Sequence, residues 1–180
     1  MQVHLDCVHC NVRQALEAAR LTTADTGIHK KIVLASLEAL AKYDSYKTPA
    51  EMSRAVHDLV KQYSGNPDPY KKVKEDSIAM ARGVYPRLKR LVEGDADRLL
   101  RALEVSAAGN LLDAGVYGDL RTQDMEAVLM EELDRGFALS DLKALRGDLP
   151  GARNVLIVAD NAGETVLDRI LISEIKRACG

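Results

Sequence analysis

The sequence has no tryptophan, one phenylalanine and six tyrosines, so aromatic residues make up only 4% of its 180 residues. Hydrophobic residues still account for 47% of the chain, and a core must therefore be built mainly from leucine, valine, isoleucine and alanine. Such residues suit packed helices. A chain of this length can form one domain with a sizeable core, or a domain with a small companion.

Long apolar runs, an excess of one charge and a dense set of cysteines are also missing. No apolar run approaches the ~20 residues that a membrane-spanning helix needs. The 25 basic and 27 acidic residues give a net charge of -2, which favours neither nucleic acid nor a membrane surface as a partner. The N-terminus does not resemble a signal peptide, and three cysteines are too few for a disulfide scaffold. We therefore expect a cytoplasmic protein.

Helical periodicity and helix-start signals dominate the first 150 residues. Apolar residues recur at helical spacing over 28–43, and Thr48-Pro49-Ala50-Glu51 combines a capping residue, a first-turn proline and a capping-box acid. A charged helix is expected over about 69–94, with a kink or break at Pro86. Further helices are predicted near residues 97–103, 123–134 and 140–145. We predict that residues 1–150 form a helical region.

The pattern changes after Pro150. Residues 154–159 form a continuous, largely β-branched run, which is typical of a strand buried on both faces. A turn follows, and then helical periodicity from Glu164 to Cys179. We expect residues 151–180 to be the first strand-loop-helix unit of a parallel α/β domain. Since one strand cannot make a sheet, the chain is expected to be truncated, or its sheet to be completed by another chain.

The turn Asp160-Asn161-Ala162-Gly163-Glu164 carries the clearest chemical signal. Asp160 follows the predicted strand, at the place where open α/β sheets present ligands. Its carboxylate and the Asn161 amide oxygen suit Mg²⁺ or a similar cation, and free N–H groups at the helix start favour an anion. Together they would clamp a phosphate, with Asp160 as metal ligand or nucleophile. The alternative is that Asp160 or Asn161 only caps the helix, and the motif alone leaves the two interpretations even.

Two other motifs contain residue types that serve in chemistry. Ser106-Ala107-Ala108-Gly109-Asn110-Leu111-Leu112-Asp113 would let backbones approach closely and project Asn110 and Asp113 from one helical turn, although the motif alone favours a helix joint with a capping asparagine. Cys7-Val8-His9-Cys10 has metal-ligand spacing, with His4 upstream, but no second pair completes a zinc site. We therefore interpret Cys7 and Cys10 as structural or redox-sensitive thiols.

Taken in order, these motifs resemble the DUF89 family of metal-dependent damage-control phosphatases, in its archaeal and bacterial branch. The resemblance covers the whole chain. It begins at Leu5-Asp6-Cys7-Val8-His9-Cys10 with Arg13-Gln14, continues through Gly109 to Asp113, and is most specific at Asp160 to Glu164 followed by Asp168.

The resemblance implies a fold, an activity and a set of site residues. It implies a helical region packed on a Rossmann-like α/β domain, and hydrolysis of phosphate monoesters such as sugar phosphates with a divalent cation, whether Mg²⁺, Mn²⁺, Co²⁺ or Ni²⁺. It places metal binding on Asp160 and Asn161, with Asn110, Asp113 and Glu164 near the substrate. Family members run longer, and their further acidic ligand and phosphate-binding lysine have no counterpart here. We therefore expect this chain alone to be weakly active or inactive.

Two other functions are alternatives to phosphatase activity. A non-catalytic helical interaction module would have its α/β edge completed by a partner, either a second copy or another chain. Dinucleotide binding is disfavoured because the turn at Asp160 lacks spaced glycines and its acid would repel a pyrophosphate. The expected partner is therefore a small phosphorylated metabolite.

Overall fold

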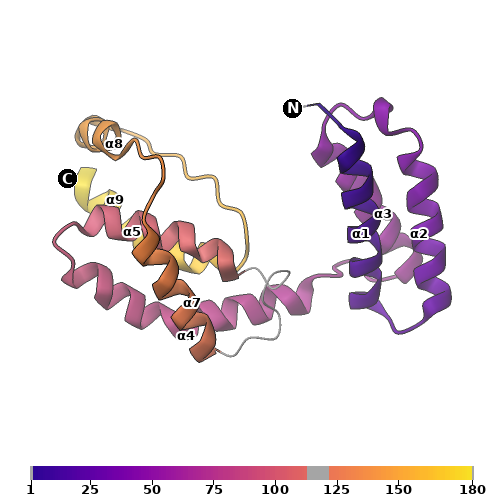
Figure 1. Cartoon of the computed structure of the whole chain (residues 1–180), viewed down its shortest axis with the longest axis horizontal. Coiled ribbons are helices and arrows are strands. Elements are labelled where there is room, and N and C mark those ends of the chain that lie inside the picture. Colours follow the sequence, from indigo (N-terminus) through magenta and orange to yellow (C-terminus); the bar gives the residue numbers. More distant parts are fainter. Residues whose placement is uncertain (1, 113–121, 180) are drawn as a thin grey trace. The chain divides into compact units, whose positions relative to one another are not determined.

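The structure is a computed structural model that describes residues 2–112 and 122–179. The chain divides into two compact units, Met1–Lys72 (unit 1) and Val73–Gly180 (unit 2). The predicted helical region, residues 1–150, contributes helices to both units (Figure 1).

Unit 1 is built from three helices that contact one another pairwise: α1 (Leu5–Thr22), α2 (Thr26–Leu40) and α3 (Pro49–Ser64), with a short 3₁₀ turn at Tyr43–Ser45. Alanines line the buried face of α1, so the other two helices can approach it closely. The fully or almost fully buried side chains of this core are Ala15, Ala18, Ala19, Ile32, Leu40, Met52, Val56 and Val60.

Side-chain caps fix where two of these helices begin. The Asp25 carboxylate accepts hydrogen bonds from the backbone N–H groups of Gly27 and Ile28 at the start of α2. Thr48 Oγ1 accepts from the Glu51 backbone N–H at 3.2 Å, which confirms the predicted start of α3. The Glu51 carboxylate reaches back to the N–H of Lys47 rather than Thr48, so the predicted capping box closes one residue early.

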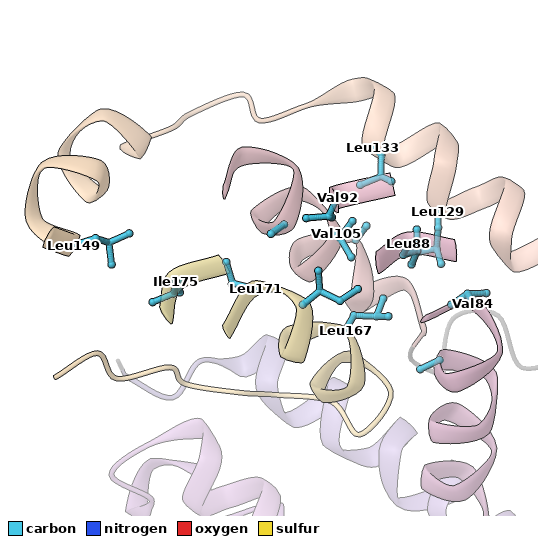
Figure 2. Packing of buried hydrophobic residues seen from close by; sticks show 14 residues of the cluster. Val84, Leu88, Val92, Val105, Leu129, Leu133, Leu149, Leu167, Leu171 and Ile175 are labelled. Carbon is cyan, nitrogen blue, oxygen red and sulfur yellow. The ribbon is translucent and has the colours of Figure 1, made fainter. Parts of the chain in front are cut away.

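Unit 2 contains α4 (Lys71–Gly94), whose first two residues precede the unit boundary, α5 (Arg98–Ala108), α7 (Thr122–Arg135), α8 (Leu142–Asp148) and α9 (Glu164–Cys179). Short 3₁₀ turns lie at Gly109–Leu112 (η2) and Leu149–Gly151 (η3). Pro86 lies inside α4 and does not end it. Figure 2 shows the apolar side chains that gather between these helices, among them Val84, Leu88, Val105, Leu129 and Leu167.

The expected Rossmann-like parallel α/β domain is wrong for this structure. Across residues 2–112 and 122–179 the chain forms helices, turns and irregular segments but no strand, and residues 154–159 are irregular. A strand persists through hydrogen bonds to a neighbouring strand, and no described residue provides one. The run is not buried on both faces either: Leu156 and Val158 are each 88% exposed, while Ile157 packs against the core of unit 2.

In the part of the chain that the structure describes, no helix is both long enough and apolar enough to cross a membrane.

Candidate functional site

Polar contacts hold α5 and α9 side by side in an antiparallel register. At one end, Arg98 Nε donates to Glu174 Oε2 at 3.1 Å, and Arg177 Nε from the next turn of α9 donates to the same oxygen at 2.9 Å. Glu174 is only 5% exposed. Burial opposes ionisation of this carboxyl group, but the hydrogen bonds and charges of the two arginines outweigh it and hold the pKa of Glu174 below its ordinary value.

A second polar contact lies two turns further along α5. Ser106 Oγ donates to Asp168 Oδ1 at 2.6 Å, and Asp168 is 5% exposed. Between the two contacts the facing residues are apolar, including Ala102, Val105 and Leu171. A buried carboxylate is costly without hydrogen-bond partners, so this contact specifies which turn of α9 faces Ser106.

The third contact is the candidate site. Asn110 lies one turn beyond Ser106, in η2, and its Oδ1 accepts a hydrogen bond from Asn161 Nδ2 at 2.8 Å. Glu164, one turn before Asp168, accepts from both the backbone N and the Nδ2 of Asn161 at 3.4 Å. Asn161 Nδ2 donates to Asn110 Oδ1 and to Glu164 Oε2. The Oδ1 atom of Asn161 therefore remains available as an acceptor.

Gly109 permits the close approach of η2 to α9. A Cβ atom at this position would lie 3.3 Å from the Glu164 Cα and 3.3 Å from its Cγ. The small-residue stretch predicted to let backbones approach closely does so here, against the first residue of α9. The structure thus brings Asn110 to Asn161, 51 residues later in the sequence, where Asn161 also contacts Glu164.

Asp160 and Gly163 complete the turn. Asp160 is exposed, and its carboxylate makes no hydrogen bond to another described residue, while Gly163 is buried where α9 begins. No side-chain oxygen of Asp160 or Asn161 accepts an N–H of α9 in the described residues, so the capping interpretation is not what the structure shows. The first turn of α9 instead has the backbone bonds Thr165 N to Asn161 O and Val166 N to Gly163 O, each 3.1 Å.

The donor set of this turn fits a hard cation only in part. A free Asp160 carboxylate and the Asn161 Oδ1 are oxygen ligands of the kind that Mg²⁺ or Mn²⁺ takes. Among the described residues, however, no three His, Cys, Asp or Glu side chains are grouped to hold a metal. Of the other predicted residues, Cys7 and Cys10 lie in unit 1, and Asp113 lies outside the described residues.

Sequence reasoning missed a cavity of about 250 Å³ beside Asn110. It is lined by Glu104, Ala107, Ala108, Asn110, Leu111, Glu132, Gly136 and Phe137. The sequence signal for this region is a glycine at position 136, because glycine commonly follows the last residue of a helix. In the structure Gly136 directly follows α7 and has a φ of 63°. Ser106 was also missed as a partner of Asp168, because nothing in either local sequence says which helix lies opposite.

The sequence of residues 3–179 matches the profile of a family described as the damage-control phosphatase ARMT1-like domain. The chain belongs to this family. The predicted DUF89 resemblance is thereby confirmed, since a crystal structure titled as a DUF89 family protein, PH1575 from Pyrococcus horikoshii, matches with a TM-score of 0.87 at 28% identity. That match covers 99% of this chain and 61% of the other.

Curated relatives show the same extent of similarity. A protein named damage-control phosphatase from Archaeoglobus fulgidus is 32% identical over 99% of this chain and 62% of its own length. Damage-control phosphatase PH1575 from P. horikoshii is 28% identical, over an alignment that covers 98% of this chain and 60% of the relative. An uncharacterized protein, MJ0202 from Methanocaldococcus jannaschii, is also 28% identical. The chain therefore spans about three-fifths of the length of these relatives.

Proposed function

We propose that this chain carries part of a metal-dependent phosphatase site, which hydrolyses phosphate monoesters of small metabolites such as sugar phosphates. The observation that carries the proposal is the pair of hydrogen bonds that Asn161 Nδ2 donates to Asn110 and to Glu164 at the start of α9. It fixes the orientation of the Asn161 amide beside a free Asp160 carboxylate. Membership of a family whose relatives are named damage-control phosphatases supports the same activity.

In this proposal the side chains of the turn hold a cation and its backbone holds the phosphate. Asp160 and Asn161 would hold a divalent cation, Mg²⁺, Mn²⁺, Co²⁺ or Ni²⁺, through their oxygens, and Asp160 is the catalytic carboxylate. When bound, the cation supplies polarisation of a phosphoryl oxygen. The backbone N–H groups at Gly163 and Glu164, at the positive end of α9, bind phosphate oxygens. Asn110 accepts from Asn161 Nδ2, which would leave the Asn161 amide oxygen available as a ligand.

The cavity beside Asn110 offers a place for the part of the substrate that does not react. Its walls combine two carboxylates, Glu104 and Glu132, with the side chain of Phe137. Each carboxylate also pairs with an arginine, at 3.0 Å for Glu104 and 2.9 Å for Glu132. Such oxygens accept hydrogen bonds from hydroxyl groups, which suits the hydroxyl-rich part of a sugar phosphate.

The first test is binding of Mn²⁺ by the 180-residue chain, followed by the electron paramagnetic resonance signal of the free ion, together with phosphate release from sugar phosphates. We expect Asp160→Ala to weaken Mn²⁺ binding at least tenfold and to abolish any metal-stimulated phosphate release. Asp141→Ala is the matched control, since Asp141 is exposed and its side chain caps no helix. Equal Mn²⁺ binding by wild type and Asp160→Ala would remove the assigned chemistry.

A second candidate function, a helical module that binds another protein, is favoured by one observation. Leu156 and Val158, two positions apart in the sequence, are large apolar side chains that are each 88% exposed, and exposed apolar surface marks interaction sites. The partner would be a second copy or another chain. Light scattering of the purified chain, with and without Leu156→Ser, tests this function. If the chain stays monomeric at high concentration and Leu156→Ser changes nothing, this segment does not mediate self-association.

A further inference from the structure

Cys7 and Cys10 belong to a motif that the proposed phosphatase site does not use. Both lie near the start of α1 in unit 1, and both are free and partly exposed. Residues three apart in a helix lie on one face, with Cα atoms about 5 Å from each other. A disulfide spans Cα separations of roughly 4.4–6.8 Å, which this spacing meets, and Cβ separations of roughly 3.5–4.5 Å. Because Cβ atoms three residues apart in a helix lie about 5–6 Å from each other, bridging this pair requires a local adjustment of the first turns of α1.

The two thiols have different surroundings. Cys7 packs against the buried core of unit 1, and its carbonyl oxygen accepts a hydrogen bond from Asn11 Nδ2 at 2.8 Å. Asn11 is only 3% exposed, so this bond fixes the turn from its buried side. Cys10 Sγ accepts a hydrogen bond from Gln14 Nε2 at 3.4 Å. Cys7 is thus the thiol that packs on the core, whereas Cys10 is partly exposed and its sulfur accepts a hydrogen bond from the half-buried Gln14.

The rest of the motif does not extend the pair into a larger ligand set. No three metal-ligating side chains are grouped among the described residues, and a closed zinc site takes four. His9 is exposed, and His4 precedes the first residue of α1. Two adjacent thiols on a fixed turn are suited to thiol–disulfide exchange, in which the second thiol is always within reach of the first.

We propose that Cys7 and Cys10 form a reversible dithiol–disulfide site that reacts with low-molecular-weight disulfides, independently of the phosphatase site. The Cys10 thiolate attacks one sulfur of the small disulfide, forms a mixed disulfide and releases one thiolate. The Cys7 thiolate then attacks the Cys10 sulfur and releases the second. The protein loses two hydrogens as the disulfide forms, and the small disulfide is reduced to two thiols.

The experiment uses oxidised glutathione as the probe and intact mass spectrometry as the readout, on the full chain carrying Cys179→Ser so that no third thiol competes. We expect the protein to lose the mass of two hydrogens with no lasting glutathione adduct, and dithiothreitol to reverse the change. With Cys7→Ser added, Cys10 should retain one glutathione, because nothing resolves the mixed disulfide. With Cys10→Ser added instead, Cys7 should react at least tenfold more slowly.

Serine is close to cysteine in size, and far-UV circular dichroism of each variant checks that unit 1 keeps its helices. A protein with both thiols that accumulates one or two glutathione adducts would overturn the proposal, because the pair then fails to close. So would thiols that stay reduced in every variant, since neither is then accessible. Equal adduct formation by the two single-cysteine proteins would overturn the assignment of Cys10 as the attacking thiol.

Discussion

Replacing Ser106 by alanine removes the hydroxyl that donates to Asp168 Oδ1 at 2.6 Å and leaves a carboxylate that is 5% exposed without this donor. A hydrogen bond to a charged group contributes about 1.5–3 kcal/mol, and a buried acceptor left unpaired costs a similar amount. We therefore expect Ser106→Ala to lower the free energy of unfolding of unit 2 by about 2 kcal/mol.

Hydrogen exchange of the backbone amides in α9 measures this loss within unit 2, because the amides report the opening of the helix that carries Asp168. A loss of about 2 kcal/mol corresponds to exchange that is roughly 30-fold faster. Ser173→Ala is the matched control: Ser173 lies on the same helix, and its exposed hydroxyl donates to the Arg169 carbonyl at 2.9 Å. That variant should change stability by less than about 0.5 kcal/mol.

Two further variants separate the hydrogen bond from simple loss of volume. Ser106→Thr keeps the hydroxyl and should retain more than half of the stability that Ser106→Ala loses. Combining Ser106→Ala with Asp168→Asn should cost less than the sum of the two single changes, since both remove the same contact. If Ser106→Ala destabilised α9 no more than Ser173→Ala does, or if the two changes were additive, the polar contact would not fix this helix pair.

The remaining predictions concern the two ends of the same helix pair. The pKa of Glu174 is lowered in the folded state, so its ionisation stabilises unit 2 above the ordinary glutamate pKa, and this contribution is lost as pH falls through the folded value. Acid unfolding followed by circular dichroism should therefore begin at a higher pH in Arg98→Met than in wild type, and an unchanged profile would contradict the role of this ion pair. Gly109→Ala should stabilise the folded state by about 1 kcal/mol through helix propensity. It also places a Cβ 3.3 Å from the Glu164 Cα, and such overpacking destabilises by about 1–3 kcal/mol. In urea unfolding we expect the free energy of unfolding to fall by about 1 kcal/mol. Gly147→Ala is the control, because a Cβ there has open space around it and should not destabilise the protein. Equal effects of the two substitutions would show that the close approach at Gly109 is unimportant.

Local sequence signals were sufficient for most helices. Thr48 and Pro49 marked the start of α3 because capping depends on residues a few positions apart. The interpretation of residues 154–159 failed for a physical reason. β-Branched residues favour a strand only where another strand accepts their hydrogen bonds, and the described residues contain none. The sequence of that run therefore reported a local preference that the structure does not satisfy.

The candidate site was harder to predict because it depends on the register of two helices. Asn110 and Asn161 were each expected near the active site, yet neither local sequence shows that one amide bonds the other. That bond follows from the pairing of Arg98 with Glu174 and of Ser106 with Asp168, which fix α5 against α9 before Asn110 is reached.

A shift of α9 by one turn would break all three contacts together, since each partner would face a residue four positions away. The side chains between them, such as Ala102, Val105 and Leu171, are apolar and would tolerate such a shift far better than a buried carboxylate would. Polar contacts therefore specify the register that the apolar core only stabilises. Because the contact of Asn110 with Asn161 lies at the end of this series, we expect it to depend on the register that the Glu174 and Asp168 contacts set along α9.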